Sequence, residues 1–168
     1  MGRKTRSFYP GVATHVTAHG VDDEPIFRSD LDRFDLLARL RRVTERADWQ
    51  IIAWCFMNTH YHLLVVAGND PRVSWAMQAI NSVYAREFNQ RYRRRGHLFG
   101  ERFTNTIIES EAHLDATINY IYENPVRAGL VRRIEDWPWS GDGRLEPRED
   151  RIVRLPMQSR DVLVRSRG

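Results

Sequence analysis

The sequence predicts an α+β fold: a ferredoxin-like split βαβ sandwich with an antiparallel four-stranded sheet and an additional C-terminal helix. Short apolar runs alternate with longer segments in which apolar residues recur at helical spacing. These are the patterns of buried strands and amphipathic helices, respectively. Their order is βαββαβ followed by one more helix, and a split βαβ sheet is the natural closure of that order.

The first half of the chain supplies three strands and one helix. Residues 11–19 alternate loosely and favour a first strand, and residues 50–56 form a second apolar run. Between them, a helix capped by Ser29 or Asp30 is predicted to run to about Arg46. Its apolar residues are spaced by four, three and four positions: Leu36, Leu40, Val43 and Ala47. Asn58 and Thr59 then make a tight connection into a third strand.

The second half begins after Gly68–Pro71, which breaks the chain. A long helix is predicted from Val73 to about Tyr92, with an apolar stripe at helical spacing: Met77, Ile80, Tyr84 and Phe88. Residues 102–109 are predicted to form the fourth strand. Ser110 can cap the last helix, which is expected to end at Asn124 because Pro125 disfavours helical angles in the residue before it.

The chain has 168 residues, which fits one domain. We assign residues 1–140 to that domain and residues 141–168 to an irregular basic tail. The single cysteine, Cys55, lies in an apolar run, which fits a reducing compartment and argues against a cysteine-based zinc site. The sequence shows neither a membrane span nor a signal peptide, so we expect a cytoplasmic location and no membrane partner.

His60 and His62 are the most informative residues. A strand repeats every two residues, so a His-x-His sequence places both imidazoles on one face. The apolar run 63–66 that follows is typical of a buried strand. Two histidines on a rigid strand suggest a divalent metal site. The alternative is a pair of histidines that only satisfy backbone or carboxylate partners, and the spacing alone leaves it open.

The last predicted helix carries a second candidate group. Tyr120 and Asn124 are four residues apart, so they lie one above the other on a face next to the apolar stripe, which is Leu114, Ile118 and Ile121. Tyr122 points roughly the opposite way. Tyr120 can act as a nucleophile, and the Asn124 amide oxygen can join the two imidazoles around Mg²⁺ or Mn²⁺. The alternative is a core-edge aromatic residue and a helix-end asparagine.

The net charge of +4 favours a polyanionic partner. A basic block and one arginine beyond it are interleaved with aromatic residues, a pattern that suits single-stranded nucleic acid. We therefore predict five phosphate contacts: Arg91, Arg93, Arg94, Arg95 and Arg102. A solvated loop is the alternative interpretation of the same residues.

Four segments resemble the single-tyrosine transposases of the HUH superfamily. Phe56–Val65 (FMNTHYHLLV) is similar to the family's LMPNHxHLL, and Arg95–Phe103 (RGHLFGERF) to GHLFQGRF. Tyr120–Val131 (YIYENPVRAGLV) resembles YIHLNPVRAGLV, and Trp137–Ser140 (WPWS) resembles the closing YPWSS. The segments stand in the family's order and spacing, and the resemblance spans residues 9–140. Within that superfamily, the sequence most resembles the REP-associated tyrosine transposases, bacterial proteins that act on imperfect DNA hairpins.

This resemblance implies a ferredoxin-like fold, a divalent ion at His60 and His62, and cleavage of single-stranded DNA through a covalent 5′-phosphotyrosine. The nucleophile corresponds to Tyr120, which makes the additional helix the catalytic one, and Asn124 corresponds to the polar residue one turn later. The chain departs from the family at three places: Asn58-Thr59 replaces Pro-Asn, Gly100-Glu101 replaces Gln-Gly, and Tyr122 stands where histidine is common.

The sequence therefore predicts a metal-dependent transposase that cleaves and rejoins single-stranded DNA at hairpin repeats, acting as a monomer or homodimer. A domesticated, non-catalytic hairpin-binding protein is the main alternative. A metal-dependent hydrolase of RNA or nucleotides is a third hypothesis. It is disfavoured because no general-base carboxylate accompanies the histidines at an obvious spacing.

Overall fold

The computed structural model describes residues 8–69 and 72–148. A sheet of five antiparallel strands runs through it in the order β4-β1-β3-β2-β5. The strands are β1 (Ala13–His19), β2 (Trp49–Phe56), β3 (His60–Ala67), β4 (Thr104–Ile107) and β5 (Ser140–Gly141). The first four form the predicted ferredoxin-like sheet, which confirms the fold class. The two-residue β5 extends it on the far side of β2.

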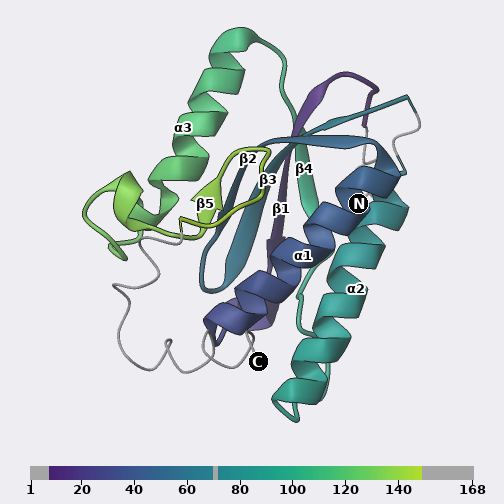
Figure 1. Cartoon of the computed structure of the whole chain (residues 1–168), viewed down its shortest axis with the longest axis vertical. Coiled ribbons are helices and arrows are strands. Elements are labelled where there is room, and N and C mark those ends of the chain that lie inside the picture. Colours follow the sequence, from purple (N-terminus) through teal and green to yellow (C-terminus); the bar gives the residue numbers. More distant parts are fainter. Residues whose placement is uncertain (1–7, 70–71, 149–168) are drawn as a thin grey trace.

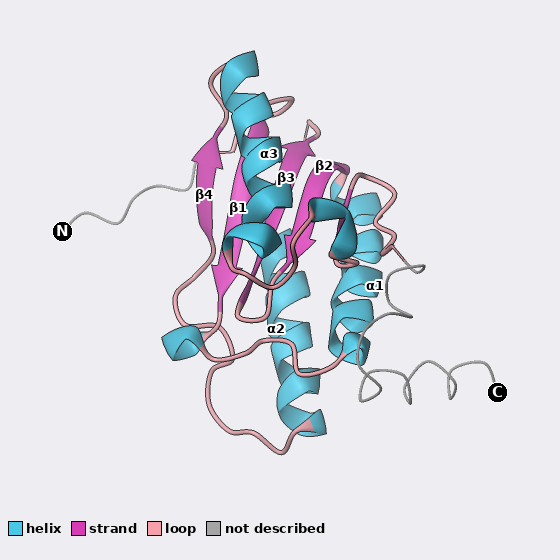
Figure 2. Cartoon of the chain, turned by 90° about the vertical axis from the view of Figure 1, so that its left-hand side faces the viewer, coloured by secondary structure: helices cyan, strands magenta, loops and turns pink. Residues whose placement is uncertain are grey.

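Helices cover both faces of this sheet. They are α1 (Asp30–Ala47), α2 (Val73–Arg91) and α3 (Glu111–Arg127), with short 3-10 turns at Val21–Asp23 and Ile134–Asp136. Figures 1 and 2 show α1 and α2 side by side on one face and α3 alone on the other. No helix in the described part of the chain is long and apolar enough to cross a bilayer.

Local sequence explains where α1 and α3 begin. Ser29 is the N-cap of α1, and it forms a capping box with Asp32. The Ser110 hydroxyl accepts a hydrogen bond from the backbone N–H of His113 (3.1 Å) and caps α3, as predicted.

The predicted end of α3 is wrong, because the helix continues past Pro125 to Arg127. Proline removes one N–H, crowds the carbonyl one turn earlier and disfavours helical angles in the residue before it, and a helix held by tertiary packing tolerates these costs. Pro125 is itself buried, and the helix ends where Gly129 adopts a left-handed conformation (φ +70°). The Leu130 N–H then reaches back to the Pro125 carbonyl (2.9 Å), which is a common way of closing a helix.

The chain beyond α3 returns to the β2 edge of the sheet. Trp137 and Trp139, from the WPWS segment, are both buried. The Trp137 indole donates to the Phe56 carbonyl (3.2 Å), and the Phe56 N–H donates to the Trp139 carbonyl (2.8 Å). The packed region extends past residue 140, since Leu145 is also buried. Most of the predicted tail, residues 149–168, lies outside the described residues, so its irregular character stays a prediction.

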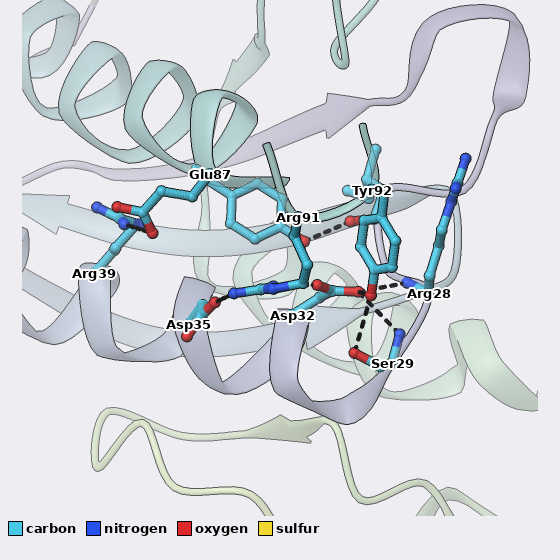
Figure 3. A network of polar contacts seen from close by, with 10 residues as sticks. Arg28, Ser29, Asp32, Asp35, Arg39, Glu87, Arg91 and Tyr92 are labelled. Carbon is cyan, nitrogen blue, oxygen red and sulfur yellow. Dashed lines mark hydrogen bonds and ion pairs between the residues drawn. The ribbon is translucent and has the colours of Figure 1, made fainter. Parts of the chain in front are cut away.

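A network of polar contacts centred on Asp32 joins α1 to the end of α2 (Figure 3). The Asp32 side chain is fully buried, and its Oδ2 accepts hydrogen bonds from the backbone N–H groups of Arg28 (2.8 Å) and Ser29 (2.9 Å). The same oxygen accepts from the Tyr92 hydroxyl (2.8 Å), while Arg91 pairs with Oδ1. Four donors thus converge on one buried carboxylate.

Cys55 lies in the middle of β2 and is completely buried. Burial in an apolar environment raises the pKa of its thiol to about 12, so almost no reactive thiolate is present at neutral pH. We expect iodoacetamide to leave Cys55 unmodified in the folded protein and to alkylate it fully in denaturant. Peptide mass spectrometry of both samples checks this, and rapid alkylation of the native protein would contradict the described packing.

Candidate functional site

Four histidines meet on the sheet face that α3 covers. The antiparallel register of β1 and β3 pairs His19 with His60 and Thr17 with His62. His15 lies two residues before Thr17 and therefore shares its face. The imidazole centroids of His19 and His60 are 4.6 Å apart, those of His60 and His62 are 4.9 Å apart, and those of His15 and His62 are 5.1 Å apart.

His62 is held at one ring nitrogen and free at the other. Its Nδ1 lies 3.0 Å from His15 Nε2 and 3.2 Å from the Thr17 hydroxyl. Its Nε2 is buried and has no hydrogen-bond partner among the described residues. When Nδ1 carries the proton and donates it to either neighbour, Nε2 presents a lone pair, which is the form that binds a metal.

His60 has a similar arrangement. Its Nδ1 lies 3.1 Å from the Thr59 hydroxyl, and its ring stacks on His19. The threonine that replaces the family's asparagine thus contacts the first histidine of the pair. Because the Nδ1 atoms of both histidines have neighbours, their Nε2 atoms are the ones left for a ligand.

Tyr120 approaches these histidines from the opposite layer. It lies on α3, and its ring centroid is 5.6 Å from that of His62 and 6.1 Å from that of His15, edge to face in both cases. Its side chain is 42 % exposed, so the tyrosine borders the histidines and solvent together. The Arg127 guanidinium, bonded to Glu123 (2.8 Å), lies 5.7 Å from the Tyr120 ring centroid.

Asn124 and Tyr122, the other two α3 residues considered from the sequence, differ in position. The Asn124 amide nitrogen donates to the Tyr120 backbone carbonyl (2.9 Å), which leaves its Oδ1 without a hydrogen-bond partner in the described region. The Tyr122 hydroxyl instead donates to the Gly141 carbonyl (3.2 Å), at the edge of the sheet. Tyr120 and Tyr122 therefore point in different directions, as the helical spacing predicted.

Burial lowers the pKa of three histidines of this cluster. It lowers the pKa of His62 to about 2, with help from the neighbouring His15 and His60. It also lowers the pKa of His15 to about 4, helped by His113, and that of His60 to about 4, helped by His19. Neutral imidazole is the form that coordinates metals, so no proton competes for these nitrogens near pH 7.

The donor set fits a divalent ion with open coordination positions. Within residues 8–69 and 72–148, no group of three or more His, Cys, Asp or Glu side chains is arranged to hold a metal. Two neutral imidazoles remain, one of which has a buried and unpartnered Nε2. Such a site would take further ligands from an amide, water or the substrate, as the predicted set of His60, His62 and Asn124 requires.

The lowered histidine pKa values predict that the metal-free protein loses stability in mild acid. An unfolded histidine has a pKa near 6.5, so below that pH the unfolded state binds more protons than the folded state. The contribution of each uncharged histidine to the free energy of unfolding is therefore fully present above pH 6.5. It is lost as the pH falls toward 4, by about 1–2 kcal/mol per histidine at pH 5.

Denaturant unfolding at pH 7.5 and pH 5, with a chelator present, measures this effect. His60→Gln is expected to remove part of the pH dependence. His97→Gln, which changes an exposed histidine far from the cluster in sequence, serves as the control. Equal pH dependence in both variants would show that His60 does not contribute to it.

The five predicted phosphate-binding arginines fall into two groups. Arg91 pairs with Asp32 and Asp35, and Arg94 bonds to Glu24 and to the His97 carbonyl (2.7 Å). The side chains of the remaining three are exposed and make no hydrogen bond or ion pair with the described residues: Arg93, Arg95 and Arg102. The charges of Arg91 and Arg94 are thus already compensated by carboxylates.

Sequence reasoning missed His15, Thr17 and His19. Their alternation was a usable signal, because it places all three on one face of the first strand. Arg127 was also missed, although it stands seven residues after Tyr120 and so returns to nearly the same side of the helix.

One family model matches most of the chain. Residues 11–124 match the family model described as "Transposase IS200 like". A REP-associated tyrosine transposase of Haemophilus influenzae is 29 % identical over 111 residues, which are 60 % of this chain and 62 % of that protein. The match thus spans about three fifths of the relative's length.

Two solved structures are similar in fold. A REP-associated tyrosine transposase bound to a REP hairpin has a TM-score of 0.66 at 23 % identity, over 83 % of this chain and 82 % of that one. A transposase from Deinococcus radiodurans R1 has a TM-score of 0.50 at 17 % identity, over 73 % of this chain and 97 % of that one. At such identities these likenesses show the fold. The family match covers most of the sequence, and the chain therefore belongs to the IS200-like transposase family.

Proposed function

We propose that this chain cleaves and rejoins single-stranded DNA next to hairpins, with Tyr120 as the nucleophile. The observation that carries the proposal is the convergence of two layers: a half-exposed tyrosine on α3 lies 5.6 Å, ring to ring, from a buried histidine of the central strand β3. A solved structure of similar fold is bound to a REP hairpin, which supports hairpin DNA as the substrate.

In the proposed reaction the Tyr120 oxygen attacks a backbone phosphorus. The bond from phosphorus to the 3′-oxygen breaks as the 5′-phosphotyrosine bond forms. The tyrosine loses its proton to solvent, and the departing 3′-oxygen takes one up. Because the new ester retains the energy of the broken bond, attack by another 3′-hydroxyl reverses these steps and joins two DNA strands without ATP.

The histidines would provide the electrostatic part of the site. Mg²⁺ or Mn²⁺ held by Nε2 of His60 and His62, with the Asn124 amide oxygen as the proposed third ligand, would supply Lewis-acid stabilisation of the phosphate oxygens. His15 and Thr17 fix the His62 ring through Nδ1, and Thr59 does the same for His60. Arg127 brings a permanent positive charge to the same side of α3 as Tyr120.

Intact-protein mass spectrometry tests the proposal. The purified protein is mixed with Mg²⁺ and single-stranded hairpin oligonucleotides from the repeats of its own genome. A DNA adduct mapped to Tyr120, and absent in His60→Ala, is the expected result. Tight binding with no adduct, across several hairpins and with both metals, would replace the proposal with the non-catalytic hairpin-binding protein.

Phosphate contacts should involve the unpaired arginines rather than Arg91 and Arg94, whose charges are compensated. We expect Arg93→Gln with Arg95→Gln to reduce the slope of log K against log salt by about 1.5, since each phosphate contact contributes about 0.7–0.9. The matched control is Arg42→Gln with Arg46→Gln, two exposed arginines of α1. Fluorescence anisotropy over a salt series gives both slopes, and indistinguishable slopes would remove these contacts.

A further inference from the structure

A cavity of about 740 Å³ lies between α2 and the loop 96–103, and none of Tyr120, His60 and His62 lines it. Its volume falls within the range of about 300–1,000 Å³ that is usual for sites binding small organic groups. The side chains that give the cavity its chemical character are three from α2 and three from the loop: Gln78, Asn81, Arg86, Phe99, Glu101 and Arg102.

The polar groups of this cavity suit the edge of a nucleobase. The Asn81 Oδ1 accepts a hydrogen bond from the buried Tyr61 hydroxyl (2.6 Å), which fixes the amide and leaves its NH₂ without a partner among the described residues. Gln78 is exposed and adds a second amide, and Glu101 adds a carboxylate. Amides and carboxylates together recognise the donors and acceptors of base edges, whereas a site for phosphate alone would not include a carboxylate.

The same cavity offers a ring and positive charge. Phe99 is half-buried, and its ring centroid lies 6.2 Å from that of Tyr61 and 6.3 Å from that of Tyr84, so two core tyrosines support it. The side chains of Arg86 and Arg102 are exposed and make no hydrogen bond or ion pair within the described region. An aromatic surface for a base beside cations for phosphates is the usual arrangement for single-stranded DNA.

Backbone hydrogen bonds connect this cavity to the histidine cluster. The Gly100 N–H donates to the His19 carbonyl (3.1 Å), and the Val21 N–H donates to the Leu98 carbonyl (3.0 Å). Phe99 therefore pairs with Gly20, directly after β1. Since the His19 ring stacks on His60, the wall of the cavity and the proposed metal ligands are joined through the end of one strand.

We propose that the cavity binds an unpaired nucleotide of the single strand that adjoins the hairpin, while a phosphate of that strand lies at Tyr120. The identity of the ligand as DNA rests on the proposed function. The base would lie against Phe99 with its edge toward Asn81 and Gln78, and the flanking phosphates would contact Arg86 and Arg102.

Binding measurements in a Tyr120→Phe background, which cannot cut the probe, test this site. Two probes are compared: a DNA hairpin with a short randomised single-stranded extension, and the same hairpin with a blunt end. Gln78→Ala removes one amide, and Ser82→Leu fills part of the cavity from its α2 wall. The controls are Gln90→Ala and Gln90→Leu, at an exposed residue of the same helix that does not line the cavity.

Both cavity variants are expected to weaken binding of the extended probe about tenfold, the worth of one stacked base, and to leave the blunt probe unchanged. The Gln90 variants should alter neither. A photo-crosslink from 5-iodouracil in the extension should map to the peptide spanning residues 96–103. Equal losses for both probes, no loss for either, or no measurable binding of the extended probe would each overturn the site.

This outcome is independent of catalysis. Loss of binding in the Gln78 and Ser82 variants, in a protein whose wild-type form gives no Tyr120 adduct, would retain the cavity and reject the proposed reaction. A Tyr120 adduct in the wild-type protein, together with unchanged binding of the extended probe by the Gln78 and Ser82 variants, would support the proposed reaction and reject the cavity as a binding site.

Discussion

Replacement of Tyr120 by phenylalanine is expected to abolish the covalent DNA adduct and to slow strand cleavage by at least about 1,000-fold. The variant keeps the ring that packs against His62 and His15 and removes only the attacking oxygen. Folding should be unaffected, because the side chain is 42 % exposed and no hydrogen bond of its hydroxyl to a described residue is lost. Loss of activity would therefore report on chemistry and not on stability.

Tyr122→Phe is the matched control for this experiment. Tyr122 lies two residues away on the same helix, and its hydroxyl donates to the Gly141 carbonyl. Burial raises the pKa of this phenol above its ordinary value, which also opposes its use as a nucleophile. We expect Tyr122→Phe to form the adduct at a near-normal rate. An adduct that persists in Tyr120→Phe and maps to Tyr122 would show that the nucleophile had been assigned to the wrong tyrosine.

The second large effect is a loss of stability, expected on replacement of Asp32 at the centre of the polar network between α1 and α2. Asp32→Ala should lower the free energy of unfolding by about 3–5 kcal/mol, because it leaves a guanidinium and several other donors without their acceptor. Those groups are the Arg91 side chain, the Tyr92 hydroxyl, and the backbone N–H groups at the start of α1. Urea unfolding followed by circular dichroism measures the change.

Asp35 provides the comparison. It pairs with the same Arg91, but its side chain is 29 % exposed, so water can replace the lost contact. Asp35→Ala is expected to cost less than about 1 kcal/mol. Equal losses in the free energy of unfolding for the two variants would show that the four donors at Asp32 do not make it more important for stability than Asp35.

Much of the fold could be predicted from the chain because its local patterns agree with its tertiary structure. The α1 stripe is buried, as predicted, and so is the α2 stripe from Met77 to Phe88. The end of α3 could not be predicted, because its continuation through Pro125 depends on packing that no local rule contains. Likewise β4 is shorter than its apolar pattern suggested.

The site was predictable in part for a similar reason. His60 and His62 share a strand face by simple alternation, and both helical spacing and resemblance to a family motif pointed to Tyr120. The approach of His15 and His19 depends on the register between β1 and β3, which is a long-range property. The pairing of Arg91 with Asp32 likewise joins two helices that are far apart in sequence, so composition alone marked Arg91 as available for DNA.

The two contacts at His62 Nδ1 have a consequence for the affinity of the proposed site for a metal ion. A surface histidine that captures an ion must first give up its rotational freedom, and this entropy loss weakens binding. The His62 ring loses that freedom when the protein folds, since it is 3 % exposed and is held between His15 and Thr17. Metal capture at this residue would then require little further ordering, and folding itself would bear the entropic cost of a preorganised ligand.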